Sequence, residues 1–240
     1  MKPIFSGIGD GRHTILVLGL ESSDHPLQAW MERALELVRD HGGQYDLAAA
    51  ARSMEPESLE NRRGPAGAWR DAFIRMPYFR DSAVGLGLIM DTFETAITWD
   101  LFESSYQSVK QEVQDAILRT TGQEAIISCR VTHAYPDGAA PYFTIAAMGS
   151  RKGDVASALA AWREIKLAAN AAVVGHGGTA THHHAIGRDH RSGYATEVPG
   201  LFRLMLAGAK AIADPTGILN PGVLYDAHNR PLGQTGILAN

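Results

Sequence analysis

The alternation of apolar and polar positions predicts both strands and helices, beginning near the N-terminus. Residues 13–20 form a short apolar run rich in β-branched and leucine side chains, which is typical of a buried strand. Apolar residues then recur at helical spacing until Gly42 and Gly43, so we expect an amphipathic helix with Ser23 or Asp24 as its N-cap. The first part of the chain is therefore expected to hold a strand followed by a helix.

The pattern is weaker between residues 44 and 83 and regular again after them. Residues 69–75 are expected to be helical, and Pro77 should end that helix because the residue before a proline disfavours helical backbone angles. A last helix is expected near residues 198–213, before an irregular tail. Between these segments, strands are expected at residues 84–97, 124–135, 142–148 and 171–174, and long helices at residues 100–119 and 153–170.

The order of these central elements predicts the fold class. The order is strand, helix, strand, strand, helix, strand, with a turn at Pro136, Asp137 and Gly138. This is the order of a split βαβ unit. We therefore expect an α+β fold of the ferredoxin-like kind, in which helices pack on one face of an antiparallel sheet.

Composition and charge exclude several classes of function. The 240 residues carry 26 acidic and 22 basic side chains, a net charge of −4, without a run of Lys or Arg, so a nucleic-acid partner is not expected. The single cysteine, Cys129, excludes a disulfide framework. No apolar stretch approaches the roughly 18 residues that a membrane-spanning helix needs, so we expect a cytoplasmic protein without a membrane span.

The histidines are concentrated in one segment. Five of the ten lie within residues 176–190, which overlap a glycine-rich stretch. Because imidazole titrates near neutral pH, His182, His183 and His184 are candidate acid/base catalysts. Two alternatives remain: an imidazole of this run hydrogen-bonds within the core, or His182 and His184, with Asp189, bind a divalent metal. The chain has no HExxH or comparable third-ligand motif, so we expect no metal site.

Other polar residues are candidates for binding an anionic substrate. Arg80 follows a turn-like, proline-containing segment, and a guanidinium there could hold an anionic group through two hydrogen bonds. A solvated pair with Asp81 is the alternative. Polar and apolar residues alternate along the strands expected around Arg130 and Tyr142. Both side chains contact a ligand if that sheet face lines a cavity; otherwise the face is merely solvated.

Four motifs, taken in order, resemble one family. They resemble the C-terminal half of FAD-linked oxidases of the vanillyl-alcohol oxidase class. Within that class the chain looks most like the alkyldihydroxyacetonephosphate synthases, flavoenzymes that replace the acyl chain of acyl-dihydroxyacetone phosphate with a fatty alcohol. The three consecutive histidines are the most specific mark. The motifs are MPYFRD at residues 76–81, SCRVTHAY at residues 128–135, GHGGTATHHHAIGR at residues 175–188 and DPTGILNPG at residues 214–222.

The resemblance implies a cap domain whose antiparallel sheet covers the flavin of FAD and shapes the substrate pocket. The histidine run and a tyrosine of the cap would then lie beside the flavin and transfer protons, and arginines would meet the anionic end of the substrate. The resemblance thus assigns catalysis to His182, His183, His184 and Tyr142, substrate binding to Arg80, Arg130 and Arg188, and cofactor contact to Asn220 and His133.

The resemblance also implies a missing part, because residues 1–12 are too few to build the family's FAD-binding domain. We expect an extension over residues 1–12, the cap domain over residues 13–222 and a tail over residues 223–240. The expected partners are a small-molecule substrate and an FAD-binding domain or subunit, and stable FAD binding by this chain alone is not expected. The alternatives are a homodimer that buries the sheet face, or a stand-alone module that binds a small anionic ligand or a metal without catalysis.

Overall fold

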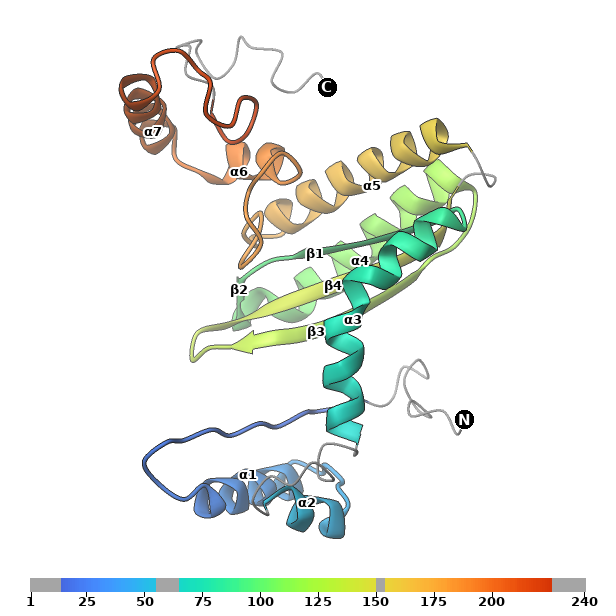
Figure 1. The fold of residues 1–240 in the computed structure, drawn as a ribbon, viewed down its shortest axis with the longest axis vertical. Helices are drawn as coiled ribbons and strands as arrows, with labels where there is room; N and C mark the ends of the chain where they lie inside the picture. The colour runs from blue at the N-terminus through green and yellow to red at the C-terminus, as the bar shows by residue number, and fades with distance from the viewer. Residues whose placement is uncertain (1–13, 55–64, 150–153, 226–240) are drawn as a thin grey trace. The chain divides into compact units, whose positions relative to one another are not determined.

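The computed structural model describes residues 14–54, 65–149 and 154–225 (Figure 1). It divides into two compact units, Met1–Tyr78 and Phe79–Asn240. The expected extension at residues 1–12 and most of the expected tail lie outside the described residues. The expected domain boundaries therefore stay a prediction.

The first unit contains short helices without a buried residue. α1 spans Gln28–Asp40 and α2 spans Leu47–Ser53. The expected amphipathic helix is present as α1, but its N-cap is Leu27, which forms no side-chain cap, rather than Ser23 or Asp24. Asp24 instead accepts a hydrogen bond from a nearby serine hydroxyl.

The strand expected at residues 13–20 is not present in the part of it that the structure describes. Residues 14–20 carry no strand, and Ile15, Leu16, Val17 and Leu18 are all exposed. The described residues of this unit offer no second strand, and an unpaired strand gains neither ladder hydrogen bonds nor a buried face. The prediction from local composition was therefore wrong here.

The second unit is built around an antiparallel sheet. β4 (Gly138–Met148) is its central strand. β1 (Leu88–Glu94) and β2 (Ile97–Thr98) pair with it, and so does β3 (Ile126–Ala134). Because Tyr142 of β4 is paired with a residue of β1 and with a residue of β3, these two strands lie on opposite edges of β4.

Two long helices cover one face of this sheet. α4 (Trp99–Thr121) and α5 (Val155–Gly175) pack against each other and against the strands (Figure 1). In the core between them and the sheet, the rings of Phe93 and Phe143 stack with centroids 4.7 Å apart. The expected α+β fold, with an antiparallel sheet and helices on one face, is confirmed. The other large core residues include Ile89, Val109, Val113, Ile117, Ile145, Ile165 and Val173.

The segment before the sheet is more helical than expected. α3 spans Pro65–Gly85 and continues through Pro77, where the sequence predicted its end. The strand expected at residues 84–97 is correspondingly shorter and starts at Leu88. Gly87, with a φ of 84°, makes the turn from the helix into the strand, a conformation that glycine adopts without strain.

The C-terminal part differs from expectation at two places. Residues 171–174, expected to be a strand, form the end of α5 because Ala172 and Val173 continue its buried face at helical spacing. The last helix is present as expected, as α7 (Gly200–Ala213), but Pro199 separates it from a short helix that the sequence did not predict, α6 (Arg191–Glu197). Among the residues that the structure describes, no helix is long and apolar enough to cross a membrane.

The uncovered face of the sheet carries polar residues. Strand residues alternate between faces, so Arg130, Tyr142 and Glu94, which are direct cross-strand neighbours, share the face opposite α4 and α5. A register shift between Val131 and His133 adds one residue to β3. This irregularity brings His133 to the same face, where strict alternation would have turned it toward the helices.

The stacked aromatic pair should dominate the stability of the second unit. Phe143→Ala removes a fully buried ring and should lower the free energy of unfolding by about 3–5 kcal/mol in urea unfolding experiments. Ile126→Ala, at a β3 position that is 74% exposed, is the control and should change it little. Equal losses in the two variants would mean that the core does not lie where the structure has it.

Candidate active site

A buried carboxylate organises the histidine run. Glu94, at the end of β1, is fully buried, and its Oε1 accepts hydrogen bonds from the backbone N–H groups of His182, His183 and His184 at 3.0, 2.6 and 2.5 Å. The hydroxyl of Thr181 donates to the same oxygen at 2.9 Å. Successive N–H groups that converge in this way form an anion-binding concavity. The carboxylate therefore holds the backbone of the histidine run in one conformation.

The same contacts keep this carboxylate ionised. Burial, the largest influence, raises the pKa of Glu94, but the N–H donors of the histidine run and the Thr181 hydroxyl together outweigh it. The pKa consequently lies below its ordinary value near 4.5. Glu94 thus presents a negative charge to the imidazole of His183, whose Nδ1 is in direct contact with Oε2.

Aromatic and imidazole rings gather above the carboxylate on the uncovered sheet face. The side chain of His183 is 43% exposed, and its ring stacks on Tyr142 with centroids 5.8 Å apart. The guanidinium of Arg130 lies 4.3 Å from the centre of the Tyr142 ring, a cation–π contact. The ring of His133 lies 4.9 Å from that of His182 and 5.7 Å from that of His183. These five side chains form one ring cluster open to solvent.

The glycine-rich stretch lets the histidine run approach the sheet edge. Gly178 lies so close to Thr95 that a methyl group there would collide with its hydroxyl. The next residue, Thr179, donates its N–H to the carbonyl of Ala96 at 3.1 Å and accepts the Ala96 N–H on its hydroxyl at 2.9 Å. This pairing, made possible by the absent side chain, brings the histidines within reach of Glu94.

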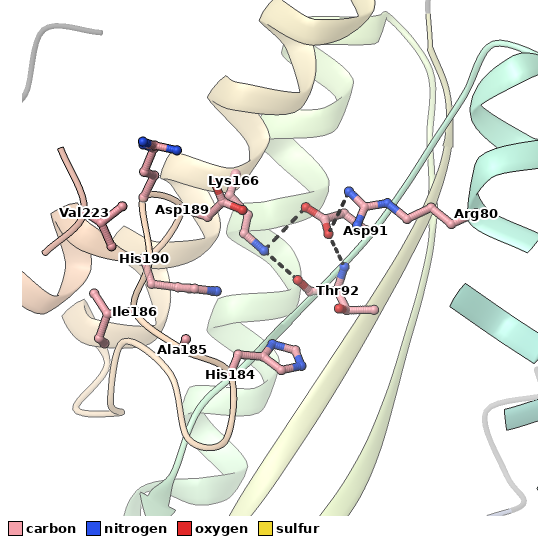
Figure 2. Close-up of a pocket in the computed structure, with 12 residues that line it drawn as sticks. Arg80, Asp91, Thr92, Lys166, His184, Ala185, Ile186, Asp189, His190 and Val223 are labelled. Atoms are coloured by element: carbon pink, nitrogen blue, oxygen red, sulfur yellow. Dashed lines mark hydrogen bonds and ion pairs between the residues drawn. The ribbon is translucent and has the colours of Figure 1, made fainter. Parts of the chain in front are cut away.

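His184 also lines a cleft of about 560 Å³ (Figure 2). The cleft lies between the edge of β1, the α5 side chains and the segment that follows the histidine run. More positively charged than negatively charged side chains line the cleft, which suits an anionic ligand. The charged and imidazole side chains that line it are Arg80, Lys166, Arg188, His184 and His190, with Asp91 and Asp189 as the acids.

A nearly buried lysine and aspartate form the wall of this cleft. The ammonium of Lys166 donates to the carbonyl of Thr92 at 2.6 Å and lies 3.4 Å from Asp91 Oδ2. Trp162 Nε1 donates to the same carboxylate oxygen at 2.6 Å, and Arg80 lies 3.7 Å from Oδ1. Figure 2 shows Lys166 and Arg80 reaching Asp91 from opposite sides. The aspartate therefore fixes both cations beside the cleft.

The two imidazoles of the cleft are held in their neutral form. Burial lowers the pKa of His184, and the charge of Lys166 adds to this effect while Glu94 opposes it. Burial likewise lowers the pKa of His190, whose Nδ1 lies 3.0 Å from the side-chain oxygen of Asn170. Neutral imidazoles can accept a proton from a bound group.

The Asn-Pro-Gly motif is tied to the rim of the cleft. Arg188 donates to the carbonyl of Pro221 at 3.1 Å, and Arg191 donates to the carbonyl of Gly222 at 2.8 Å. Asn220 has a φ of 46° and an exposed side chain. The motif therefore borders the cleft through its backbone, and its asparagine is not part of the lining.

The family described as FAD linked oxidases, C-terminal domain, matches residues 5–224. The chain belongs to this family. FAD is accordingly the cofactor of the proteins to which it is related.

Two curated relatives of this FAD-linked oxidase domain carry the same name. The chain is 29% identical to the alkyldihydroxyacetonephosphate synthase of Trypanosoma brucei brucei over 67% of this chain and 25% of that protein. It is 27% identical to the synthase of Caenorhabditis elegans over 64% of this chain and 26% of that protein. A solved alkyldihydroxyacetonephosphate synthase structure matches with a TM-score of 0.39 at 20% identity, covering 66% of this chain and 24% of its own. The chain spans about a quarter of the length of these relatives.

The predicted site residues of this FAD-linked oxidase domain fall into two adjoining groups. The ring cluster contains two of the three predicted catalytic histidines, and His184 joins it to the cleft, because its ring lies 5.4 Å from Tyr142. Asn220 belongs to neither group. The ring cluster brings together His182, His183, Tyr142, Arg130 and His133, and the cleft brings together His184, Arg80 and Arg188. Their roles in the reaction stay predictions.

The structure shows the neighbours of the residues for which the sequence left alternatives open. Arg80 pairs with Asp91 in the wall of the cleft rather than with Asp81. The histidine run is bent around Glu94 and not extended. The metal-ligand group considered from the sequence, His182 and His184 with Asp189, is not among the convergent groups of the described residues, which are His133 with His182 and His183, and Glu94 with His183 and His184.

Three important residues of the site, Glu94, Asp91 and Lys166, were not predicted from the sequence. Glu94 and Asp91 lie in an apolar strand segment, LIMDTFE, where carboxylates are costly to bury unless they are paired. That pattern is the signal that could have found them. Lys166 had a similar signal, because it is a cation at a helix position that the apolar spacing places among the buried residues. Neither signal reveals which partners these charges meet.

The carboxylate of Glu94 should contribute stability that depends on pH. Because its pKa is lowered by folding, its contribution is present above the ordinary value near 4.5 and is lost as the pH falls through the folded value. Glu94→Gln should therefore lower the free energy of unfolding by about 1–3 kcal/mol at pH 7, since charged hydrogen bonds are lost. Denaturant unfolding across pH 7 to 3 measures this difference, which should shrink in the acidic range.

The matched control for that series is Glu103→Gln. Glu103 lies on α4, is exposed and accepts a hydrogen bond only from the nearby Gln107 among the contacts described. Its substitution should be nearly neutral at every pH. A Glu94→Gln effect that stays constant with pH would contradict the ionised, hydrogen-bonded carboxylate.

Proposed function

We propose that these residues are the substrate-cap part of an FAD-linked enzyme whose reaction resembles that of the alkyldihydroxyacetonephosphate synthases. The cap would act with an FAD-binding region outside the 240 residues, on the same or on another polypeptide. The observation that carries the proposal is the ring cluster: imidazoles fixed by a buried carboxylate next to Tyr142, on a sheet face that α4 and α5 leave open.

The contacts of His183 suit proton transfer. The ionised Glu94 lies against Nδ1 and favours the tautomer with its proton on that nitrogen, which leaves Nε2 to take a proton from a reacting group. The 43% exposure of the side chain gives a substrate access to the ring. The rings of Tyr142 and His184 flank it, with centroids 5.8 and 4.8 Å away, so two further groups able to exchange protons lie beside the same substrate position.

The ring cluster fits contact with the ring system of FAD, whereas the backbone N–H groups beneath it are not available for the diphosphate. When bound, FAD supplies the electron-accepting chemistry that side chains lack. Flat rings on an open face suit a planar heterocycle. The convergent N–H groups of His182, His183 and His184, which would suit a phosphate, are already taken by Glu94. An FAD-binding region elsewhere is therefore part of the proposal.

The cleft is proposed to hold the anionic end of the substrate. Arg80, Arg188 and Lys166 supply its positive charge, and Asp91 holds two of these cations in place. Guanidinium groups match the geometry of a phosphate or carboxylate. Since His184 borders both the cleft and the ring cluster, a substrate anchored in the cleft can reach the imidazoles.

A binding module without catalysis is the second candidate function. The cationic cleft favours it, because the cleft is complete within the described residues and needs no second region. One measurement distinguishes the two candidates, because only the first predicts a change in flavin absorbance when an FAD-binding region is added to the protein. The alternative of a homodimer that buries the sheet face stays a prediction, and measuring the mass of the protein in solution tests it.

Loss of the ring-cluster residues should abolish catalysis. With the FAD-binding region supplied, His183→Asn and Tyr142→Phe should each lower the rate of fatty-alcohol exchange by about 10²–10⁴-fold, as for lost acid/base groups. His25→Asn, at an exposed site of the first unit, is the control and should keep full activity. No flavin change and no turnover by the unsubstituted pair would refute the enzyme proposal.

Binding in the cleft can be measured without flavin. Calorimetric titration with dihydroxyacetone phosphate should give saturable binding that Arg188→Gln weakens by about tenfold or more, since a charged hydrogen bond is worth roughly 1.5–3 kcal/mol. Arg33→Gln, at an exposed arginine that pairs with Glu36 on α1, should bind normally. Equal affinities in the two variants would exclude the cleft as the anion site.

A further inference from the structure

Two buried side-chain atoms, one in the ring cluster and one in the carboxylate beneath it, lack a hydrogen bond. They are Nδ1 of His182 and Oε2 of Glu94, and among the described residues only the Nε of Arg203 shares this condition. The Nδ1 of His183 touches Oε2, but its direction does not make a hydrogen bond. Buried polar atoms without a partner are rare and call for an explanation, such as a ligand that the protein binds.

Three imidazoles converge at this place. His133 comes from β3, and His182 and His183 come from the bend around Glu94. One ring nitrogen of each lies within 4.8 Å of the others. We propose that His133, His182 and His183 form a binding site for a divalent transition-metal ion of the Zn²⁺ class.

The surroundings of each ring prepare one nitrogen for a metal. The hydroxyl of Thr132 donates to the carbonyl of Ala140 at 3.1 Å, so its oxygen is available to accept from Nδ1 of His133, also 3.1 Å away. Nε2 of His182 lies 3.0 Å from the hydroxyl of Tyr135. Metal-bound histidines commonly donate their second nitrogen to such an acceptor, which fixes the tautomer.

Glu94 plays the same part for His183. The negative charge of the carboxylate beside Nδ1 favours the proton on that nitrogen and leaves Nε2 as a ligand, and a small rotation of the ring would turn this contact into the hydrogen bond of a carboxylate–histidine–metal triad. Nδ1 of His182 forms no hydrogen bond and lies 4.0 Å from Oε2 of Glu94, so it is the corresponding ligand nitrogen when its Nε2 donates to Tyr135. Each of the three rings thus has one nitrogen beside an acceptor and a second nitrogen that could bind the ion.

The geometry requires only small adjustments. Zinc binds imidazole nitrogen at about 2.0–2.1 Å, so tetrahedral ligands lie roughly 3.3 Å apart. His133 and His183 are exposed and can rotate toward the ion. Three imidazoles leave a fourth position for water, and nitrogen ligands of this kind suit Zn²⁺, Ni²⁺ or Cu²⁺ rather than Mg²⁺ or Ca²⁺.

This site overlaps the proposed proton-transfer residues but does not depend on them. A metal ion on the lone pairs of His182 and His183 would remove the nitrogens that accept protons. Bound metal is therefore expected to inhibit the enzyme activity proposed above. The binding itself needs only this chain, so a failure of the flavin experiments leaves the metal proposal standing, and the reverse also holds.

The test is a titration of the untagged 240-residue chain with Zn²⁺ by calorimetry and with Co²⁺ by visible absorption. We expect saturable one-to-one binding and a Co²⁺ spectrum of tetrahedral type. His133→Ala, at an exposed position of β3 that should not disturb folding, is expected to weaken binding by about tenfold or more. Absence of saturation, or the same affinity in His133→Ala, would overturn the proposal.

A control and a second variant make the result specific. His41→Ala removes an exposed histidine that follows α1 and should leave the affinity unchanged. Thr132→Val removes the proposed acceptor for His133 together with its hydrogen bond to Ala140, and it should weaken binding less than His133→Ala does because the ligand itself remains. If His41→Ala weakens binding as much as His133→Ala, the metal binds by scattered surface histidines and the proposed site is wrong.

Discussion

The site depends on one interaction, the capture of three successive backbone N–H groups by the carboxylate of Glu94. A buried charge is costly, and hydrogen bonds from N–H and hydroxyl donors offset that cost. The same hydrogen bonds attach the bend that carries His182, His183 and His184 to the end of β1. The orientation of the imidazoles, their contact with Tyr142 and the wall of the cleft all follow from this attachment.

The two faces of the sheet have different roles: one face packs against helices, and the other carries the polar groups of the site. One face meets α4 and α5 through stacked aromatic and aliphatic side chains, which stabilise the second unit. The opposite face carries Arg130 and Tyr142 in register with Glu94. Because neighbouring strand residues point to opposite faces, the same strands that build the core also present the polar groups. The irregularity in β3 adds His133 to this polar face.

His184 links the two parts of the site. It lines the cationic cleft and also contacts the ring cluster, so an anion held beside Arg188 lies near groups that can exchange protons. The open sheet face would in addition accept a flat cofactor or a metal ion, since both use exposed rings with available lone pairs. The chemistry of the domain is therefore set by what covers this face.

The sequence alone determined the elements that rest on local periodicity. The helix at residues 100–119 and the strand pair around residues 124–148 follow from spacing over many positions, and so did the fold class. Short apolar runs were less informative: residues 14–20 lack a partner strand, and residues 171–174 extend α5. The histidine run was visible as an unusual concentration of one titratable side chain.

Only the tertiary structure decided how those residues act together. Glu94 and Lys166 meet partners that lie 88 to 90 and 74 positions away in the chain, a separation at which local patterns carry no information. The extra residue in β3 changes which face His133 occupies, and spacing in the sequence does not reveal it. Side-chain type fixes the chemistry that is available, whereas long-range pairing fixes which groups converge and which charges are buried.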